Sequence, residues 1–319
     1  MTDPQFGRTP PDFQAPFDVS AVRNFVVAGL SRSLLAQVER RLIAHASRLI
    51  ANLSDFGFDI VSGYCMPLTA FAFCEVFGTP QKDRTEFLKN SWVLTPLRED
   101  RDIDITADEA IAWFRAHIKS LLSTTVSDGQ LDILSFFRNQ DPSVSDDDMA
   151  GFAISMLVAG NDSAANLLSS SIFNLSKTPT LLTALREEQC DVSEIVRELV
   201  RFDSPVYPGI SRYAQEDTLL LNQPVARGDL IILPIAAAGR DPGVFNSPET
   251  CRLGRQNARS LAFGYGQHFC PGYQLAARVV EIGISAFANS TIFETIIPRF
   301  EPRWTSLPLR ALVRLRLVQ

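Results

Sequence analysis

Residues 261–277 hold the side chains that could bind a metal through a thiolate. The sequence LAFGYGQHFCPGYQLAA contains the pattern F-G-x-G-x-H-x-C-x-G, formed by Phe263, Gly264, Gly266, His268, Cys270 and Gly272. Two glycines within three residues let a loop fold tightly where side chains would collide. Helix-forming sequence follows Cys270 at once, and an anionic sulfur is favoured at a helix N-terminus, where backbone amides also tune its electron density. The stretch therefore predicts a cysteine thiolate that is held as a metal ligand.

These six positions resemble the haem-binding signature of the cytochrome P450 family. The alternative is a buried structural cysteine in a glycine-rich turn, which six matched positions disfavour. The resemblance implies that Cys270 is the axial ligand of haem b, where a thiolate donates the electron density that favours O–O cleavage. It covers about residues 20–319. The fold that it implies is mainly α with a minor β region.

A second polar cluster interrupts a long apolar segment that is expected to be a core helix. In the sequence AGNDS, Gly160 would let a ligand approach the helix, while Asp162 and Ser163 place an acid beside a hydroxyl. Such a pair is costly to bury without a function, although an ordinary polar kink is the alternative. The resemblance implies that this segment faces the oxygen side of the haem and that the acid–alcohol pair organises proton delivery. Ser163 replaces the commoner threonine and should be less fixed in its rotamer.

The sequence E-x-x-R occurs twice on one predicted helix. Glu198 and Arg201 lie three residues apart and so share a helix face, and Glu194 and Arg197 repeat the spacing one turn earlier. As a bare motif this is usually a solvated surface pair. We choose the later pair because F-D-S-P follows it, as the resemblance requires. The pair is then expected to lock the segment beneath the haem, with Arg255 as a candidate third member.

Haem carries two propionates that need cationic or hydrogen-bonding partners. The resemblance assigns this role to Arg23, Arg212 and His268, although each arginine alone would more often be an ordinary surface charge. Two histidines that are common in the family are replaced here, by Val19 and Ser260. Propionate binding is therefore expected to depend on the arginines.

The composition limits the class of protein. The chain has 319 residues, 46% of them hydrophobic, and a formal net charge of −6, which argues against general nucleic-acid binding. Its five cysteines are irregularly spaced, with no C-x-x-C pair, and no apolar run reaches the length of a membrane span. With no recognisable signal peptide, these features predict a soluble cytoplasmic protein without disulfides.

The periodicity of apolar residues predicts the elements that must position these side chains. Ser31 is expected to cap the second of two early helices, with Ser33 as the less favoured alternative, and Ser145 is expected to start a long core helix. Cys65 and Cys74 are expected in the core, and His45 and His117 on the surface. The expected helices lie within 20–53, 58–78, 79–94, 106–126, 131–138, 145–176, 179–188, 191–203 and 271–289, and strands within 211–214, 218–222, 230–238 and the tail.

The chain is expected to form a Pro-rich extended arm, 1–18, and a single haem-binding domain, 19–319. The family normally has a β-rich portion and a B-helix before the helix of the propionate arginine, and only about twenty residues precede it here. The fold is therefore expected to lack most of these parts. The distal pocket would be open, closed by the arm, covered by a partner chain, or lined by a bulky substrate.

The leading hypothesis is a haem-thiolate monooxygenase that activates O2 to hydroxylate or oxidatively couple a small organic molecule, such as a secondary metabolite. The sequence has no flavin- or nicotinamide-binding segment, so electrons are expected from a ferredoxin and its reductase. One alternative is a peroxide-using or non-oxygenating haem-thiolate enzyme, which the acid–alcohol pair disfavours. Another is a non-catalytic helper of a partner enzyme, which Cys270 disfavours and the short N-terminus favours.

Overall fold

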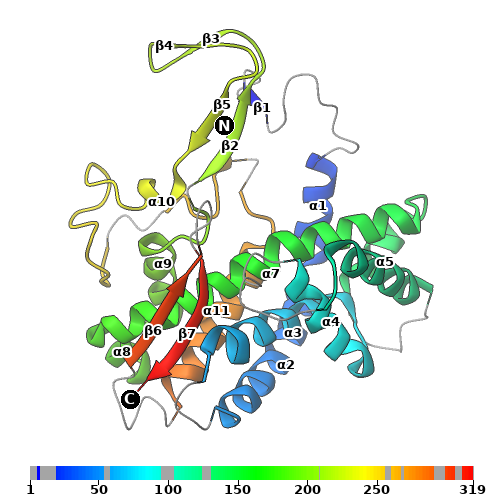
Figure 1. Ribbon diagram of the computed structural model, residues 1–319, viewed down its shortest axis with the longest axis horizontal. Coiled ribbons are helices and arrows are strands. Elements are labelled where there is room, and N and C mark those ends of the chain that lie inside the picture. The colour runs from blue at the N-terminus through cyan, green and yellow to red at the C-terminus, as the bar shows by residue number, and fades with distance from the viewer. Residues whose placement is uncertain are drawn as a thin grey trace.

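A long helix, α7 (Asp146–Lys177), crosses the molecule, and several of the other helices pack against it (Figure 1). Ser145 caps it as expected, because its hydroxyl accepts a hydrogen bond from the backbone N–H of Asp148. Three aspartates in the first turn complement the helix dipole. This computed structural model describes residues 6–7, 19–53, 58–94, 104–123, 131–207, 209–255, 260–266, 269–290, 299–305 and 311–318.

The fold is mainly helical with small sheets, as the sequence predicts. Ser31 caps helix α2 (Arg32–Ala51), and Gly78, in the left-handed conformation, ends helix α3 (Met66–Phe77). The remaining helices are α1 Val19–Gly29, α2 Arg32–Ala51, the π-helical turn Val61–Cys65, α3 Met66–Phe77, the 3-10 turn Gln81–Asp83, α4 Arg84–Val93, α5 Ala107–Ser123, α6 Ile133–Gln140, α8 Pro179–Arg186, α9 Val192–Phe202, α10 Ile235–Ala238 and α11 Tyr273–Ala288.

The described strands form three antiparallel sheets, with the orders β1-β2-β5, β3-β4 and β6-β7. The predicted strands of the tail are confirmed as β6 and β7 (Figure 1). Residues 235–238 were expected to continue a strand and instead form α10, because Pro234 cannot donate to a ladder and the alanines after it favour a helix. The strands are β1 Phe6–Gly7, β2 Ile210–Ala214, β3 Thr218–Leu220, β4 Gln223–Val225, β5 Leu230–Leu233, β6 Arg299–Trp304 and β7 Leu312–Val318.

Part of the predicted N-terminal arm pairs with the body of the protein. Phe6 and Gly7 form β1 and lie opposite Ala214 and Tyr213 of β2. The other residues of 1–18 lie outside the described part of the chain. The single-domain reading of 19–319 stays a prediction.

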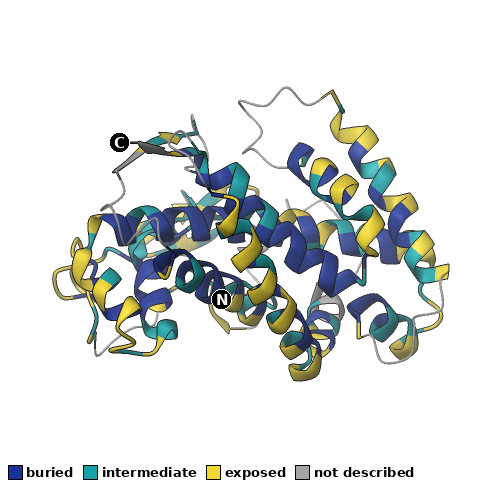
Figure 2. Ribbon diagram, turned by 90° about the horizontal axis from the view of Figure 1, so that it is seen from below, coloured by how far each residue is buried: buried dark blue, intermediate teal, exposed yellow. Residues whose placement is uncertain are grey.

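The core lies along the C-terminal half of α7, where it meets α3 and α11 (Figure 2). A Cβ on Gly283 of α11 would come within 2.6 Å of the Leu168 side chain, so the glycine lets the two helices approach closely. Cys65 and Cys74 lie in this core as predicted, and burial raises the pKa of both thiols. Among the described helices, none combines the length and the apolar character that crossing a lipid bilayer would require.

Both histidines that were expected on the surface lie against aromatic rings. His117 is only 8% exposed, stacks on Trp113 at 4.7 Å and has its Nε2 3.2 Å from the Thr79 hydroxyl. His45 is half-buried and stacks on Phe71 of α3 at 3.9 Å. Burial lowers the pKa of both imidazoles, that of His45 to about 4. The surface prediction was wrong because these contacts come from neighbouring helices or from residues one turn away.

Candidate functional site

The cysteine loop folds as its glycines require. Gly264 and Gly266 have φ values of 80° and 65°, in the left-handed region that other residues rarely adopt. The backbone N–H of Cys270 then donates to the carbonyl of Phe263 at 2.7 Å, which closes the loop. The loop therefore delivers Cys270 directly to the start of α11.

The sulfur of Cys270 lies among groups that stabilise a negative charge. Burial raises the pKa of the thiol, while the backbone N–H groups of Gly272 and Tyr273 and the nearby Arg23 lower it. Burial has the larger effect, so the pKa stays above its ordinary value. Cys270 is thus half-buried beside backbone amides and a guanidinium that favour the anionic form of its thiol, which is what a tuned thiolate ligand needs.

Aromatic side chains fasten the loop to α11. The Phe263 ring packs edge-on against Tyr273 at 4.9 Å, and Phe269 lies 5.4 Å from the same ring. Tyr265, between the two left-handed glycines, is 71% exposed. The loop is thus held on its inner side and open to solvent at its tip.

Two of the three predicted propionate ligands are described by the structure. Arg23 on α1 donates through Nε to the carbonyl of Phe269 at 3.2 Å, so it is attached to the cysteine loop. Arg212 on β2 is 8% exposed, and the hydrogen bond that the described residues give it is to the carbonyl of Ser211. His268 lies outside the described residues. Among the described residues, the one partner of this buried guanidinium is a neutral carbonyl, so its positive charge is left to be balanced, which suits a haem propionate.

The predicted acid and alcohol lie on α7 beside its exposed face. Ser155, Val158 and Ala159 are exposed in the middle of this helix, and Asp162 and Ser163 are half-buried next to them. The Ser163 hydroxyl donates to the carbonyl of Ala159 at 2.8 Å, which leaves its oxygen as an acceptor. The two residues share an open surface, and their role in proton delivery stays a prediction.

Gly160 has a packing role that the sequence did not reveal. A Cβ at this position would lie 2.6 Å from Cζ of Phe73 on α3. The glycine therefore makes room for an aromatic ring of a neighbouring helix. Its predicted role in letting a ligand approach α7 is not tested by this contact.

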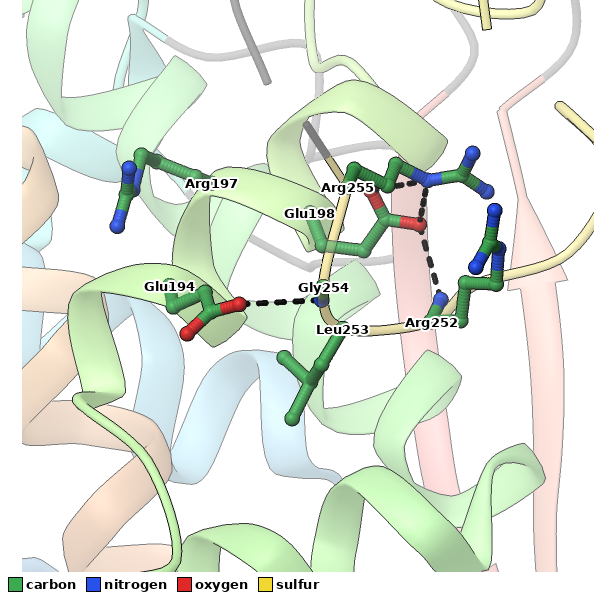
Figure 3. A pocket seen from close by; sticks show the side chains of 7 residues that line it. All are labelled: Glu194, Arg197, Glu198, Arg252, Leu253, Gly254 and Arg255. Atoms are coloured by element: carbon green, nitrogen blue, oxygen red, sulfur yellow. Dashed lines mark hydrogen bonds and ion pairs between the residues drawn. The ribbon is translucent and has the colours of Figure 1, made fainter. Parts of the chain in front are cut away.

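Glu198, Arg201 and Arg255 come together as one ionic cluster. Arg201 donates to both carboxylate oxygens of Glu198 at 2.8 Å, and Arg255 Nε approaches the same oxygens at 2.8 and 3.0 Å. The backbone N–H of Arg252 adds a fourth donor at 2.9 Å (Figure 3). Burial opposes the charge of Glu198, but these donors lower its pKa overall. Arg201 also donates to three backbone carbonyls, those of Gly239, Pro248 and Thr250.

The earlier E-x-x-R pair does not join this cluster. Glu194 accepts from the backbone N–H of Gly254 at 3.1 Å, and Arg197 donates to the carbonyl of Ser193. Figure 3 shows the Arg197 side chain pointing away from Glu198. The two turns of α9 line a small pocket of about 70 Å³ with residues 252–255. The backbone carbonyls that accept from Arg201, and the backbone N–H groups that donate to Glu198 and Glu194, could not be predicted from the sequence. Every residue has these groups, so residue types do not reveal which of them will be bound.

Comparisons with known proteins define the family. The model of the cytochrome P450 family matches residues 86–287, and the chain therefore belongs to the cytochrome P450 family. Members of this family carry haem b with a cysteine thiolate as axial ligand. Of the residues described above, Cys270, Arg23 and Arg212 have the chemistry that fits this cofactor.

Individual relatives come from several bacteria. Cytochrome P450 105C1 of a Streptomyces species is 29% identical over 72% of this chain and 59% of its own length. Vitamin D(3) 25-hydroxylase of Pseudonocardia autotrophica is 28% identical over 82% of this chain and 65% of its own. The crystal structure of the LnmA cytochrome P450 hydroxylase, from the leinamycin biosynthetic pathway of Streptomyces atroolivaceus S-140, superposes with a TM-score of 0.83 at 25% identity. That superposition covers 99% of this chain and 86% of the LnmA chain, whereas the chain spans less than two thirds of these two curated relatives.

Proposed function

We propose that this chain is a haem-thiolate monooxygenase that uses O2 to hydroxylate or oxidatively couple a small organic molecule, such as a secondary metabolite. The observation that carries the proposal is the position of Cys270, half-buried at the start of α11, where burial raises the pKa of its thiol and the backbone N–H groups of Gly272 and Tyr273 oppose that rise. Two of the relatives are named hydroxylases, and one belongs to a biosynthetic pathway, which supports this substrate class.

The proposed haem site uses residues from the cysteine loop and two arginines from elsewhere in the chain. Cys270 would hold the haem iron, and Arg23, Arg212 and His268 would hold the propionates. Phe263, Gly264, Gly266 and Gly272 shape the loop that presents the sulfur. When bound, the haem supplies the redox chemistry that activates O2.

Asp162 and Ser163 would move protons on the open face of α7. The Ser163 hydrogen is donated to the Ala159 carbonyl, so its oxygen can accept a hydrogen bond from a proton donor in the pocket. The neighbouring Asp162 carboxyl can release a proton at its Oδ atoms and recover one from solvent. Gly160 belongs to the same segment and would let a ligand approach.

Electrons would come from a ferredoxin and its reductase in the cytoplasm. The donor would dock on the cysteine-loop face, where Tyr265 and Phe269 are 71% and 36% exposed. On the opposite side of the proposed haem, Val158 of α7 is 45% exposed, which leaves an apolar surface for substrate or for a covering partner chain.

The test is the spectrum of the reduced protein with carbon monoxide. A Soret band at the position of a thiolate ligand is expected, and Cys270→Ser should abolish it while Cys251→Ser leaves it unchanged. If the haem-reconstituted wild-type protein gives no such band, the enzyme proposal fails. A band without turnover, with either reduced ferredoxin or peroxide, would favour a non-catalytic helper.

The proton-delivery roles need a separate measurement. Asp162→Asn should slow product formation and raise the fraction of electrons lost as hydrogen peroxide. Lys177→Gln, at the far end of the same helix, is the control. Unchanged coupling of electrons to product in Asp162→Asn would refute the assigned role.

A further inference from the structure

Among the described residues, one buried amide oxygen in the middle of α7 has no hydrogen-bond partner. Asn161 is 3% exposed, and its Oδ1 is fully buried and accepts no hydrogen bond. The orphaned atom is the amide oxygen, Oδ1. Buried polar groups in native proteins nearly always have a partner, so this amide requires an explanation.

Most other buried polar side chains on α7 have a hydrogen-bond partner, unlike the Oδ1 of Asn161. Asn166 accepts from the backbone N–H of Leu312 at 3.2 Å, and Asn174 donates to Asp203 at 3.2 Å. Ser169, Ser170 and Ser176 each donate to a carbonyl three residues earlier. These five buried side chains on α7 are therefore satisfied by protein partners.

Ser171 is the other residue on α7 with a buried oxygen that lacks a partner. A serine on a helix can rotate its hydroxyl toward the carbonyl one turn earlier. Ser155 and Ser163 on the same helix already make this bond. An asparagine amide carries both a donor and an acceptor, and a single helix carbonyl cannot satisfy both. Asn161 is therefore the residue that needs an external partner.

The amide does not face the proposed haem pocket. At 3.6 residues per turn, Asn161 and Ser163 are about 200° apart around the helix axis. Among the helical neighbours of Asn161, Leu157, Ala164, Ala165 and Leu168 are at most 5% exposed, whereas Val158, three residues earlier, is 45% exposed. Whatever binds the amide lies on the core side of α7 and must be small enough to fit among packed side chains.

We propose that Asn161 binds an internal water molecule on the core side of α7. A water accepts from Nδ2 and donates to Oδ1, which satisfies both halves of the amide at once. On the other side of the same helix turn, Asp162 and Ser163 are half-buried beside the open face. The segment AGNDS thus places polar side chains on two sides of α7. The proposed water site at Asn161 does not depend on haem or substrate.

A crystal structure of the haem-loaded protein at a resolution of about 1.8 Å or better tests this directly, because buried waters are well ordered at such resolution. A solvent peak within hydrogen-bond distance of Asn161 Oδ1 or Nδ2 is expected, and Asn161→Leu should lose it. A wild-type map without that peak, or with a protein atom in hydrogen-bond distance, would overturn the proposal.

Thermal unfolding of the same pair of proteins gives an independent reading. If the amide is hydrated, removing it does not stabilise the protein, and the Tm of Asn161→Leu should not exceed that of the wild type. If the amide is dry and unpaired, the variant should be more stable, by about 3 °C or more. Such a rise would contradict the water site, whatever the activity of either protein.

Discussion

Glu198 and Arg201 form a bidentate ion pair that is almost completely removed from solvent. Both nitrogen–oxygen distances are 2.8 Å, and the side chains are 6% and 1% exposed. Arg255 shares the same carboxylate, and its own side chain is 5% exposed. Since the carboxylate faces two guanidinium groups, its loss would leave two buried positive charges without a counter-ion.

We therefore expect Glu198→Gln to be strongly destabilising. The free energy of unfolding should fall by about 3 kcal/mol, as for other broken buried ion pairs. Urea unfolding monitored by circular dichroism measures this free energy. Glu194→Gln, the same substitution one turn earlier, is the matched control and should cost less than about 1 kcal/mol, because Glu194 has one backbone N–H donor. Equal losses in the two variants would contradict the special role of the Glu198 cluster.

Much of the helical framework follows from local signals in the sequence. Ser31 and Ser145 cap their helices, and Gly78 ends one, because each has the side chain or the backbone freedom that the position needs. The boundaries of α7 and α9 accordingly lie within a residue or two of the predicted ones. The pairing of Phe6 and Gly7 with β2 could not be predicted, since nothing local specifies a partner two hundred residues away.

In the site, too, the contiguous motif could be predicted from the sequence, whereas contacts between distant residues could not. Cys270 and its glycines form a contiguous motif, and the structure folds them as one loop. Arg255 was found only as a candidate, because it reaches Glu198 through a loop whose course the sequence does not dictate. The unpartnered amide of Asn161 was not visible at all, since an unsatisfied group is defined by what surrounds it.

Arg212 should contribute directly to haem affinity. Arg212→Gln removes a buried charge from β2 and should weaken haem binding about 10- to 100-fold, the usual effect of losing a charge-assisted hydrogen bond. Haem transfer to excess apomyoglobin measures this loss. Arg227→Gln, an exposed arginine between β4 and β5, is the control and should leave the transfer rate unchanged. If both variants lose haem at the wild-type rate, Arg212 does not hold a propionate.

His45 should make the protein less stable in mild acid. Burial, then Arg48 and Arg84, lower the pKa of its imidazole from 6.5 to about 4, so the folded state resists protonation. Between these two values the unfolded chain binds a proton that the folded protein does not, and stability falls as the pH is lowered from 6.5 to 4. Below pH 4 this loss is complete, at about 2 kcal/mol after allowance for partial exposure.

His45→Phe isolates this effect, because phenylalanine keeps the stack on Phe71 and cannot titrate. The difference in unfolding free energy between wild type and variant should change across pH 4–6.5 and stay constant at higher pH. Carboxylates titrate in the same range, but they contribute equally to both proteins and cancel in the difference. A difference that does not depend on pH would show that His45 titrates normally in the folded state.

The contact between Gly160 and Phe73 predicts a reversal of the usual helix preference. Alanine in a helix interior is normally more stable than glycine by about 1 kcal/mol. In Gly160→Ala, the new Cβ would lie 2.6 Å from the ring of Phe73, which is itself 5% exposed and has little room to move. Overpacking of this kind costs about 1–3 kcal/mol, so we expect a net loss of stability of about 1 kcal/mol.

A double-mutant cycle separates this clash from other effects. In a Phe73→Leu background the ring is gone, and Gly160→Ala should become neutral or stabilising. Urea unfolding of the four proteins should give a coupling energy of about 1–2 kcal/mol, as expected for residues in direct contact. Additive effects would mean that α3 and α7 do not meet at this point. Coupling, by contrast, would establish that the glycine next to the proposed proton-delivery residues is required by the packing of α3 against α7, independently of any ligand.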